Sequence, residues 1–312
     1  MPKPVALILL NWNTPEYTAS CITSVQQNCD AADYDLIIAD NGSTDGSLSK
    51  LRTQFPDLIF IDNQTNLGYA GGNNTALQYA LDHGYTYSLV MNNDTTVGPG
   101  MIRGLMNHLD QHPRAAAAQP AIYWMHEPEK LWNAEGRFQQ ITGKVYAVKK
   151  PTTKEMILAE WLTGCCILLR NTVLKECGLF NSRFFLYYED VELSFRLRAA
   201  GYELHYLPNL SMYHEAGASG KVSAQKEGTL NPVIHYYVSR NHLWFLRKYG
   251  NPLFYPVMFL VYTPYYTALL TYFLLRGRKK KALSLFNGLK DGLFESEKVI
   301  WPKIGTALKP NS

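Results

Sequence analysis

Polar clusters follow four short apolar runs in the first third of the chain, and their residue types could bind a nucleotide, a diphosphate and a cation. The clusters are Asn11–Asn13, Asp40–Ser47, Asn66–Asn74 and Asn92–Thr95. A carboxylate such as that of Asp40 can accept hydrogen bonds from a base or a ribose, and Asp94 could hold a divalent cation that bridges a diphosphate. Asx turns and helix N-caps use the same residue types, so no single cluster decides for function.

Glycines dominate the third cluster. We expect Gly68–Gly72 to form a loop that precedes a helix at Asn73–Asp82, where the backbone can approach a diphosphate and present N–H groups to it. The segment lacks the GxGxxG spacing of dinucleotide-binding folds, which disfavours a dinucleotide cofactor.

The elements that must position these clusters alternate between short apolar runs and helical patterns, which predicts βαβ units. Strands are expected at Val5–Leu10, Leu36–Ala39, Leu58–Ile61 and Tyr87–Met91, and helices at Pro15–Gln27, Ser47–Gln54 and Asn73–Asp82. The runs are apolar throughout, as in parallel strands that are covered on both faces. Ligands bind at the carboxyl ends of such strands, so the four clusters should meet at one edge of an α/β sheet.

The pattern loosens between residues 113 and 157, where we expect an insertion of strands and loops. A second apolar run follows at Trp161–Leu169, then a helix at Val191–Ala200 and a strand at Glu203–Leu207. Glu189 and Asp190 open that helix, a position where the helix dipole favours acids whatever their chemistry.

Composition narrows the function classes. Of the 312 residues, 46% are apolar and 18% charged, which excludes a disordered chain. The net charge of +4 is too small to indicate a nucleic-acid partner. Five cysteines without CxxC spacing predict neither disulfides nor a zinc site, and the N-terminal run is a strand rather than a signal peptide. We therefore expect a cytoplasmic chain with reduced thiols.

The C-terminal part has a different character. No charged residue lies between Lys248 and Arg276, and residues 276–312 carry 9 basic and 3 acidic side chains. About 20 apolar residues can span a bilayer as a helix, but three prolines should kink the segment and six tyrosines suit the membrane interface. The basic run Arg276–Lys281 suits an anionic membrane surface. We expect a membrane-associated segment, whether interfacial, re-entrant or hairpin; the alternative is a buried helix with a solvated basic face.

Taken together, the clusters resemble the inverting family 2 glycosyltransferases, in particular the bacterial rhamnosyltransferase-like branch. The resemblance rests on DNGSTDGS at Asp40–Ser47, NLGYAGGNN at Asn66–Asn74 and NNDT at Asn92–Thr95. It continues through Trp161–Gly164, Gly178–Arg198, His214 and Tyr236–Asn241, and it covers about residues 1–250. It implies a GT-A (Rossmann-like) domain at 1–245, with a donor half at about 1–112 and an acceptor half at about 113–245. A C-terminal membrane-associating region at 246–312 completes the chain.

The resemblance also implies roles for single residues. Asp190 would be the general base, and Glu189 would position the acceptor or the helix. Asp94 would be the carboxylate of a DxD-type motif and His214 a distal ligand, together holding Mg²⁺ or Mn²⁺, although Asn92 replaces the first Asp of that motif. The expected nucleotide-sugar site comprises Asn11, Asn13, Asp40, Asn66, Gly68, Gly71, Asn74, Asn92, Asn93, Trp161, Thr163, Gly164 and Arg240. For Arg240 the alternative to a diphosphate contact is a surface ion pair.

The implied activity is transfer of a sugar, with rhamnose the first candidate, from a dTDP-, UDP- or GDP-linked donor to a lipid-linked or polysaccharide acceptor. It would take place at the cytoplasmic face of the bacterial plasma membrane, in cell-surface glycan biosynthesis. Galactofuranose, glucose or galactose remain alternatives, as does a catalytically silent nucleotide- or glycan-binding member. A nucleotidyltransferase is disfavoured because Asn11–Thr14 supply neither a glycine-rich loop nor a basic residue. Self-association is left open.

Overall fold

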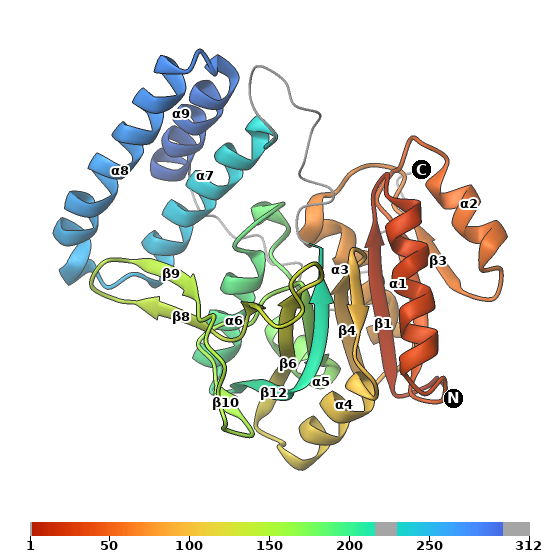
Figure 1. Ribbon diagram of the computed structural model, residues 1–312. Helices are drawn as coiled ribbons and strands as arrows, with labels where there is room; N and C mark the ends of the chain where they lie inside the picture. Colours follow the sequence, from red (N-terminus) through yellow and green to blue (C-terminus); the bar gives the residue numbers. More distant parts are fainter. Residues whose placement is uncertain (1, 216–229, 296–312) are drawn as a thin grey trace.

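The computed structural model describes residues 2–215 and 230–295, and a large mixed sheet with helices on both faces forms its core (Figure 1). The main strands are β1 (Val5–Asn11), β2 (Tyr34–Asp40), β3 (Ile59–Asp62), β4 (Tyr87–Asn92), β6 (Ala115–Trp124), β10 (Ile157–Leu158), β11 (Cys166–Arg170) and β12 (Glu203–His214). Their order is β10-β12-β6-β11-β4-β1-β2-β3. The first four strands pair in parallel, whereas β11 is antiparallel to both of its neighbours. The predicted α/β sheet is confirmed.

Both faces of the sheet are buried, which explains why the strands are apolar throughout. On one face, Leu7 and Leu9 of β1 pack in a core with α1 (Pro15–Asn28) and α4 (Met101–Gln111). On the other face, Ala6 and Ile8 pack in a second core. Its helices are α3 (Gly68–Asp82), α5 (Asn171–Cys177) and α6 (Glu189–Ala199), while α2 (Ser47–Gln54) lies between β2 and β3 along the chain.

The carboxyl ends of the parallel strands meet at one edge, as expected. Asn11 lies opposite Asp40, and Asp40 lies opposite Asp62. On the other side of β1, Leu10 lies opposite Asn92. This register brings the polar clusters of the first, second and fourth strands side by side.

The expectation that the whole of 113–157 is an insertion is wrong for its first part. β6 is a ten-residue strand of the main sheet, and it lies between β11 and β12. It begins with Ala115–Ala118, all buried, and alanine has little of the β-branched character that announces a strand. The rest does form strands and loops, with β7 (Leu131–Asn133), β8 (Gly136–Gln139), β9 (Lys144–Ala147) and β10.

The strand expected at Glu203–Leu207 continues to His214. It follows β6 in parallel, with a register shift between Leu207 and Ser211. Its end pairs with β5 (Thr95–Val97), so that His214 lies opposite Thr95. The longer strand therefore carries His214 to the edge where the other polar clusters lie.

Three C-terminal helices form a lobe beyond the sheet (Figure 1). They are α7 (Pro232–Tyr249), α8 (Tyr255–Leu275) and α9 (Lys279–Phe294), with a short 3₁₀ turn, η2 (Pro252–Phe254), before α8. Pro252 and Pro256 lie at the starts of η2 and α8, where proline is tolerated, and only Pro264 lies inside the described part of α8. Pro252 and Pro256 therefore do not kink the segment as expected, and the expected kink stays a prediction at Pro264 alone.

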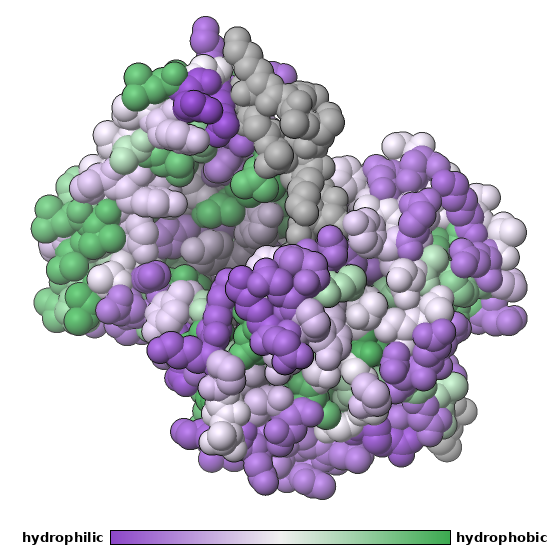
Figure 2. Space-filling model, in the orientation of Figure 1, coloured by the Kyte–Doolittle hydropathy of each residue, from purple (hydrophilic) through white to green (hydrophobic). Residues whose placement is uncertain are grey.

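Among the described residues, the segment Pro252–Leu275 is long and apolar enough to cross a membrane by length and composition alone. Only 11% of its most apolar window is buried. Figure 2 shows apolar side chains gathered on the lobe that contains it. The alternative of a buried helix is therefore contradicted.

Candidate active site

The ends of β1 and β2 are tied together by Asp40, which is only 2% exposed. Asn11 Nδ2 donates to Asp40 Oδ2 at 2.8 Å, and the backbone N–H of Ser43 donates to Asp40 Oδ1 at 2.9 Å. Thr18 Oγ1 in turn donates to Asn11 Oδ1 at 2.7 Å. Asp40 therefore fixes the conformation of the loop that follows β2.

Asn13 and Asn93 order the neighbouring loops. Asn13 has a positive φ of 54° and accepts a hydrogen bond from the backbone N–H of Thr44 at 2.8 Å. Asn93 Nδ2 donates to Thr14 Oγ1 at 2.8 Å and to Thr18 Oγ1 at 2.7 Å. The amides connect the loops after β1, β2 and β4 into one polar surface.

The expectation that Gly68–Gly72 form a loop is wrong, because α3 begins at Gly68. Gly68 has a φ of +73°, and a Cβ on it would lie 2.4 Å from the Phe185 carbonyl oxygen. A Cβ on Gly71 would lie 3.0 Å from that of Leu67. Gly68 therefore allows the helix to pack closely against the loop at Phe185, and Gly71 leaves room for the side chain of Leu67.

The asparagines that flank the glycines make intramolecular bonds as well. Asn66 Oδ1 accepts from the Gly68 N–H at 2.8 Å and so holds the start of α3. Asn74 Nδ2 donates to the Phe180 carbonyl at 2.8 Å, and Asn74 Oδ1 accepts from the Phe180 N–H at 3.1 Å. The third cluster thus docks α3 onto the segment that leads to Glu189 and Asp190.

Asp94 and His214 meet where β5 pairs with the end of β12. His214 Nε2 lies 3.1 Å from Asp94 Oδ1 and 3.3 Å from Asn92 Nδ2. Both side chains are buried, at 7% exposure for Asp94 and 4% for His214. His214 Nδ1 has no hydrogen-bond partner among the described residues.

This pair fits a divalent cation. Adjacent ligands of an octahedral ion with bonds of 2.0–2.1 Å lie about 3 Å apart, close to the separation of these two atoms. Carboxylate oxygen suits Mg²⁺ and Mn²⁺, and imidazole nitrogen is a common ligand of transition metals. With a single carboxylate, the site carries less negative charge than a full DxD motif would.

Asp190 is partly buried, and two backbone N–H groups hold its carboxylate. Gly164 N–H donates to Asp190 Oδ2 at 2.9 Å, and Val191 N–H donates to Asp190 Oδ1 at 2.8 Å. Burial raises the pKa of Asp190, and these hydrogen bonds oppose the rise. The result is a carboxylate that is fixed in position and more basic than an exposed aspartate.

The neighbouring Glu189 differs from Asp190 in its environment. Its Oε2 is buried without a hydrogen-bond partner among the residues described. Burial, and then the charge of Asp190, raise the pKa of Glu189 well above its ordinary value. Of the two acids, Asp190 is the one that the surroundings favour in the ionised form.

The loop before these acids has a strained backbone. Phe185, Tyr187 and Tyr188 all have positive φ, at 59°, 68° and 69°. Such conformations cost on the order of 1–3 kcal/mol each and persist only where the surroundings enforce them. This strain lies directly before the pair Glu189–Asp190.

Helix α7 supplies the groups that hold this loop. Asn241 Nδ2 lies within 2.9 Å of three loop carbonyls, those of Phe184, Leu186 and Tyr187. Arg240 Nη2 donates to the carbonyls of Arg183, at 2.7 Å, and Phe184, at 3.2 Å. Arg240 is only 8% exposed and lies over the ring of Trp244, so the surface ion pair considered above is wrong.

The segment Trp161–Gly164 connects the two halves of the site. Thr163 N–H donates to Gln119 Oε1 at 2.7 Å, and Trp161 Nε1 donates to the Arg137 carbonyl at 3.3 Å. The next residue, Cys165, accepts from the Asn92 N–H at 2.9 Å. Burial raises the pKa of the Cys165 thiol, and the charges of Asp94 and Asp190 raise it further. Gly164 holds Asp190 and Cys165 holds Asn92, so this segment joins the two carboxylate-bearing parts of the site.

The family model for glycosyl transferase family 2 matches residues 7–178 of this chain, more than half of its length. The chain belongs to glycosyltransferase family 2.

Two curated relatives of this glycosyltransferase are rhamnosyltransferases. The first is the N-acetylglucosaminyl-diphospho-decaprenol L-rhamnosyltransferase of Mycobacterium tuberculosis, 29% identical over 66% of this chain and 75% of the relative. The second is the dTDP-rhamnosyl transferase RfbF of Shigella flexneri, 22% identical over 78% of this chain and 80% of the relative. The predicted resemblance to the rhamnosyltransferase-like branch is confirmed.

Solved structures confirm the GT-A fold of this glycosyltransferase. The mannosyltransferase PcManGT from Pyrobaculum calidifontis, in complex with GDP-Man and Mn²⁺, matches 95% of this chain and 90% of its own, with a TM-score of 0.55 and 13% identity. GalNAc-T7 with UDP, GalNAc and Mn²⁺ matches 78% of this chain with a TM-score of 0.59 and 12% identity. This chain spans half the length of that protein.

Several residues of the glycosyltransferase site were missed by the sequence analysis. Tyr69 OH donates to the Gly164 carbonyl at 2.6 Å. It thereby links α3 to Gly164, the residue whose N–H holds Asp190. Tyr69 lies inside the glycine-rich cluster Asn66–Asn74, so its position in the sequence could have indicated a role at the site. Gln119, which supports Thr163, and Asn241, which holds the strained loop, gave no signal in the sequence because both depend on tertiary packing.

Glu189 should make the stability of the glycosyltransferase depend on pH. In the folded chain its carboxyl group stays protonated above the ordinary pKa of 4.5, whereas in the unfolded chain it ionises. Unfolding then releases a proton, so the stability falls as the pH rises from 4.5 towards the raised pKa. Because glutamine cannot ionise, Glu189→Gln should have a higher Tm than the wild type at neutral pH, and the difference should shrink at acidic pH.

Differential scanning fluorimetry across this pH range measures the effect, with the exposed Glu129→Gln as the matched control. A Tm difference that is the same at every pH would contradict the buried, protonated state of Glu189.

Proposed function

We propose that this enzyme is an inverting glycosyltransferase that moves a sugar, with rhamnose the first candidate, from a nucleotide diphosphate to a lipid-linked glycan acceptor. One observation carries the proposal: hydrogen bonds of two consecutive residues, Gly164 and Cys165, connect Asp190 to the Asp94–His214 pair. Gly164 N–H donates to Asp190 at 2.9 Å, and the Cys165 carbonyl accepts from the N–H of Asn92, whose Nδ2 lies 3.3 Å from His214 Nε2. The rhamnosyltransferase names of the relatives support the choice of sugar and acceptor.

In this mechanism Asp190 accepts the proton of the acceptor hydroxyl as that oxygen forms a bond to the anomeric carbon of the sugar. The bond between this carbon and the diphosphate oxygen breaks on the opposite face, and its electron pair leaves with the diphosphate. A single base, without a carboxylate nucleophile, gives inversion at the anomeric carbon. Its raised pKa makes Asp190 a stronger base for this step.

Asp94 and His214 are the residues that would hold the divalent cation, with Asn92 next to them. When bound there, Mg²⁺ or Mn²⁺ would supply positive charge next to the departing diphosphate. We assign the nucleotide to the loops that Asn11, Asn13, Asp40 and Asn93 order. Gly164 and Trp161 would lie on the sugar side, and Arg240 would act by holding the loop before Glu189.

The C-terminal lobe suits a membrane surface and the lipid of the acceptor. Phe259 and Leu260 of α8 are 68% and 71% exposed, and the basic residues Arg276 and Lys279 follow at the end of the helix. Anionic lipids attract such residues by about 1 kcal/mol each. We propose that this face lies on the cytoplasmic side of the bacterial plasma membrane.

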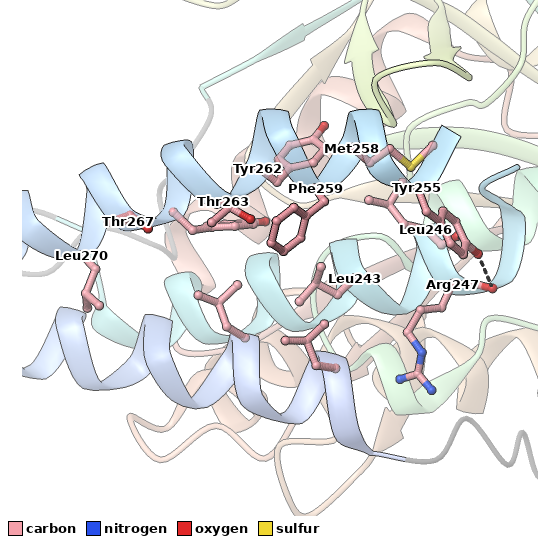
Figure 3. A pocket seen from close by; sticks show the side chains of 13 residues that line it. Leu243, Leu246, Arg247, Tyr255, Met258, Phe259, Tyr262, Thr263, Thr267 and Leu270 are labelled. Atoms are coloured by element: carbon pink, nitrogen blue, oxygen red, sulfur yellow. Dashed lines mark hydrogen bonds between the residues drawn. The ribbon is translucent and has the colours of Figure 1, made fainter. Parts of the chain in front are cut away.

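An apolar hollow of about 380 Å³ lies between α7, α8 and α9 (Figure 3). Leu243, Leu246 and Met258 line it, together with Phe259. Because Phe259 also belongs to the exposed face of α8, the hollow adjoins the proposed membrane surface. We propose that it receives part of the hydrocarbon chain of the lipid-linked acceptor.

Replacing both Phe259 and Leu260 with serine should weaken binding to anionic vesicles at least tenfold. Each large apolar side chain contributes about 1.5–3 kcal/mol when it is fully buried. Co-sedimentation with vesicles that contain phosphatidylglycerol measures the change, and Leu158→Ser, 53% exposed on β10, is the matched control. Equal loss in both variants, or no loss in either, would argue against the assignment of this face.

The function is tested by nucleotide-diphosphate release from a panel of dTDP-, UDP- and GDP-sugars in the presence of a lipid-linked acceptor extract. Release from dTDP-rhamnose, with a product of inverted anomeric configuration, is the expected result. Release from a donor of galactofuranose, glucose or galactose would keep the transferase and change its sugar. Donor binding without release from any donor, at every acceptor tried, would favour a catalytically silent binding protein.

A further inference from the structure

Three histidines outside the candidate active site lie together at the opposite end of the sheet. His108 is in α4, His112 follows the end of that helix, and His205 is near the start of β12. One ring nitrogen from each lies within 4.8 Å of the other two. At about 3.3 Å per residue, the run of β12 from His205 to His214 separates this cluster from the Asp94–His214 pair by roughly 30 Å. Figure 1 shows α4 and the start of β12 at the far end of the sheet from the tip of β12.

Hydrogen bonds fix the proton on two of the three rings. His112 Nδ1 lies 2.7 Å from the His108 carbonyl oxygen; a carbonyl only accepts, so Nδ1 carries the proton and Nε2 keeps its lone pair. His205 Nε2 lies 3.1 Å from Glu203 Oε2, so Nε2 donates to the carboxylate and Nδ1 keeps its lone pair. Each of these rings therefore has one nitrogen free to bind a metal ion.

The third ring completes the set. His108 Nε2 lies 2.7 Å from His205 Nδ1, where it donates a hydrogen bond in the absence of a metal. Burial, and then the nearby His112 and His205, lower the pKa of His108 to about 4, so the ring is neutral. A neutral imidazole can carry its proton on Nδ1 instead, which gives His108 Nε2 a lone pair for a metal ion. The rings of His108 and His112 are stacked, with centroids 4.0 Å apart and 20° between their planes, so one of them turns when both bind the same ion.

The surroundings resemble those of a metal ligand set. A carboxylate that accepts from the second nitrogen of a ligating histidine orients the ring and raises its basicity; Glu203 does this for His205 and is itself paired with Arg114 at 3.3 Å. Arg170 Nη2 donates to the carbonyls of Leu109, at 2.6 Å, and His112, at 3.3 Å, and so fixes the end of α4. His108 and His112 are partly exposed, which gives an ion access.

We propose that His108, His112 and His205 form a binding site for Zn²⁺, with Glu203 orienting His205. Three imidazole ligands and one open position are a common set for this ion, with Zn–N distances of about 2.0–2.1 Å. In tetrahedral geometry such nitrogens lie roughly 3.3 Å apart, so His108 and His205 would separate slightly as the ion replaces their hydrogen bond. The bound ion joins α4 to β12 at the end of the sheet remote from the proposed chemistry.

Zinc titration of the full-length protein by calorimetry tests the proposal, with Co²⁺ absorption spectra to report nitrogen ligands in tetrahedral geometry. The variant His108→Gln/His112→Gln should bind one equivalent of Zn²⁺ fewer than the wild type and lose the Co²⁺ bands. The control His126→Gln removes a histidine whose side chain is 56% exposed. It should keep both the full zinc stoichiometry and the Co²⁺ bands. Glu203→Gln should bind the same number of Zn²⁺ equivalents as the wild type, but with an affinity that is about 10–100-fold lower.

The Asp94–His214 pair can bind metal as well, and the variants separate the two sites. A His214→Gln variant should keep the Co²⁺ bands that the double variant loses. If the double variant does not fold, His112→Gln alone, at the exposed end of α4, should weaken zinc binding by about tenfold or more. Equal zinc stoichiometry and affinity in the wild type and the histidine variants would overturn the proposal.

Discussion

Asp190→Asn should lower kcat by about 10²–10⁴-fold, the contribution expected of a positioned general base. The carboxylate is the group that takes the acceptor proton in the proposed mechanism, and an amide cannot do so. The variant should still fold and bind donor. Asparagine can accept from only one of the N–H groups of Gly164 and Val191, so the other is left unpaired at a cost of about 1–3 kcal/mol in stability.

The measurement is the initial rate of nucleotide-diphosphate release, beside donor affinity by calorimetry. Asp57→Asn, an exposed aspartate before β3, is the matched control. Because burial raises the pKa of Asp190 above its ordinary 3.8, kcat/KM of the wild type should fall, as pH decreases, at a higher pH than an exposed aspartate would give. A variant that retains most of the wild-type rate would require another base.

The positions of the donor-side residues follow directly from local sequence. Apolar strands such as Val5–Asn11 are recognisable because both faces are covered, and polar residues come directly after them. Parallel pairing then forces Asn11, Asp40 and Asn92 to one edge of the sheet. Neither step requires knowledge of distant contacts, which is why this half of the site could be predicted.

The acceptor side depends on contacts between distant segments, and the sequence predicts it less well. His214 reaches Asp94 only because β12 continues past a register shift to pair with β5. Arg240 and Asn241 hold a loop more than fifty residues earlier in the chain, and the residue type of Arg240 suggested only a phosphate or an ion pair. Their function follows from the strained backbone at Tyr187 and Tyr188, which no sequence pattern announces.

The glycine-rich cluster has a packing role that the sequence analysis did not predict. Glycine at position 68 suggested room for a phosphate, yet the space that a Cβ would fill is occupied by Phe185. The same contact lets the Ala70 N–H donate to the Phe185 carbonyl at 3.2 Å. The start of α3 is thereby fixed to the loop before Glu189, so the donor and acceptor halves meet through these glycines.

Asp94→Asn should reduce kcat about 10²–10³-fold and make the remaining rate depend on much more cation. A bound divalent ion stabilises developing charge by several kcal/mol, and about 1.4 kcal/mol corresponds to a factor of ten in rate. Asp94 carries the only carboxylate within 3.1 Å of His214 among the described ion pairs, so its loss leaves a neutral site. Changes in the outer shell alone cost about 10–100-fold in metal affinity, and loss of a charged ligand should cost at least that.

The rate is measured against Mn²⁺ concentration and after EDTA treatment, with the exposed Asp82→Asn as the matched control. Asn92→Asp provides a test in the opposite direction, because it adds a second carboxylate beside His214, where Asn92 Nδ2 now lies 3.3 Å from Nε2. It should lower the Mn²⁺ concentration needed for half-maximal rate. If Asp94→Asn raises this concentration and Asn92→Asp lowers it, the charge at this edge of the sheet governs cation binding. If both variants and the wild type respond alike to Mn²⁺, and EDTA leaves all three active, the Asp94–His214 pair serves only to join β5 to β12.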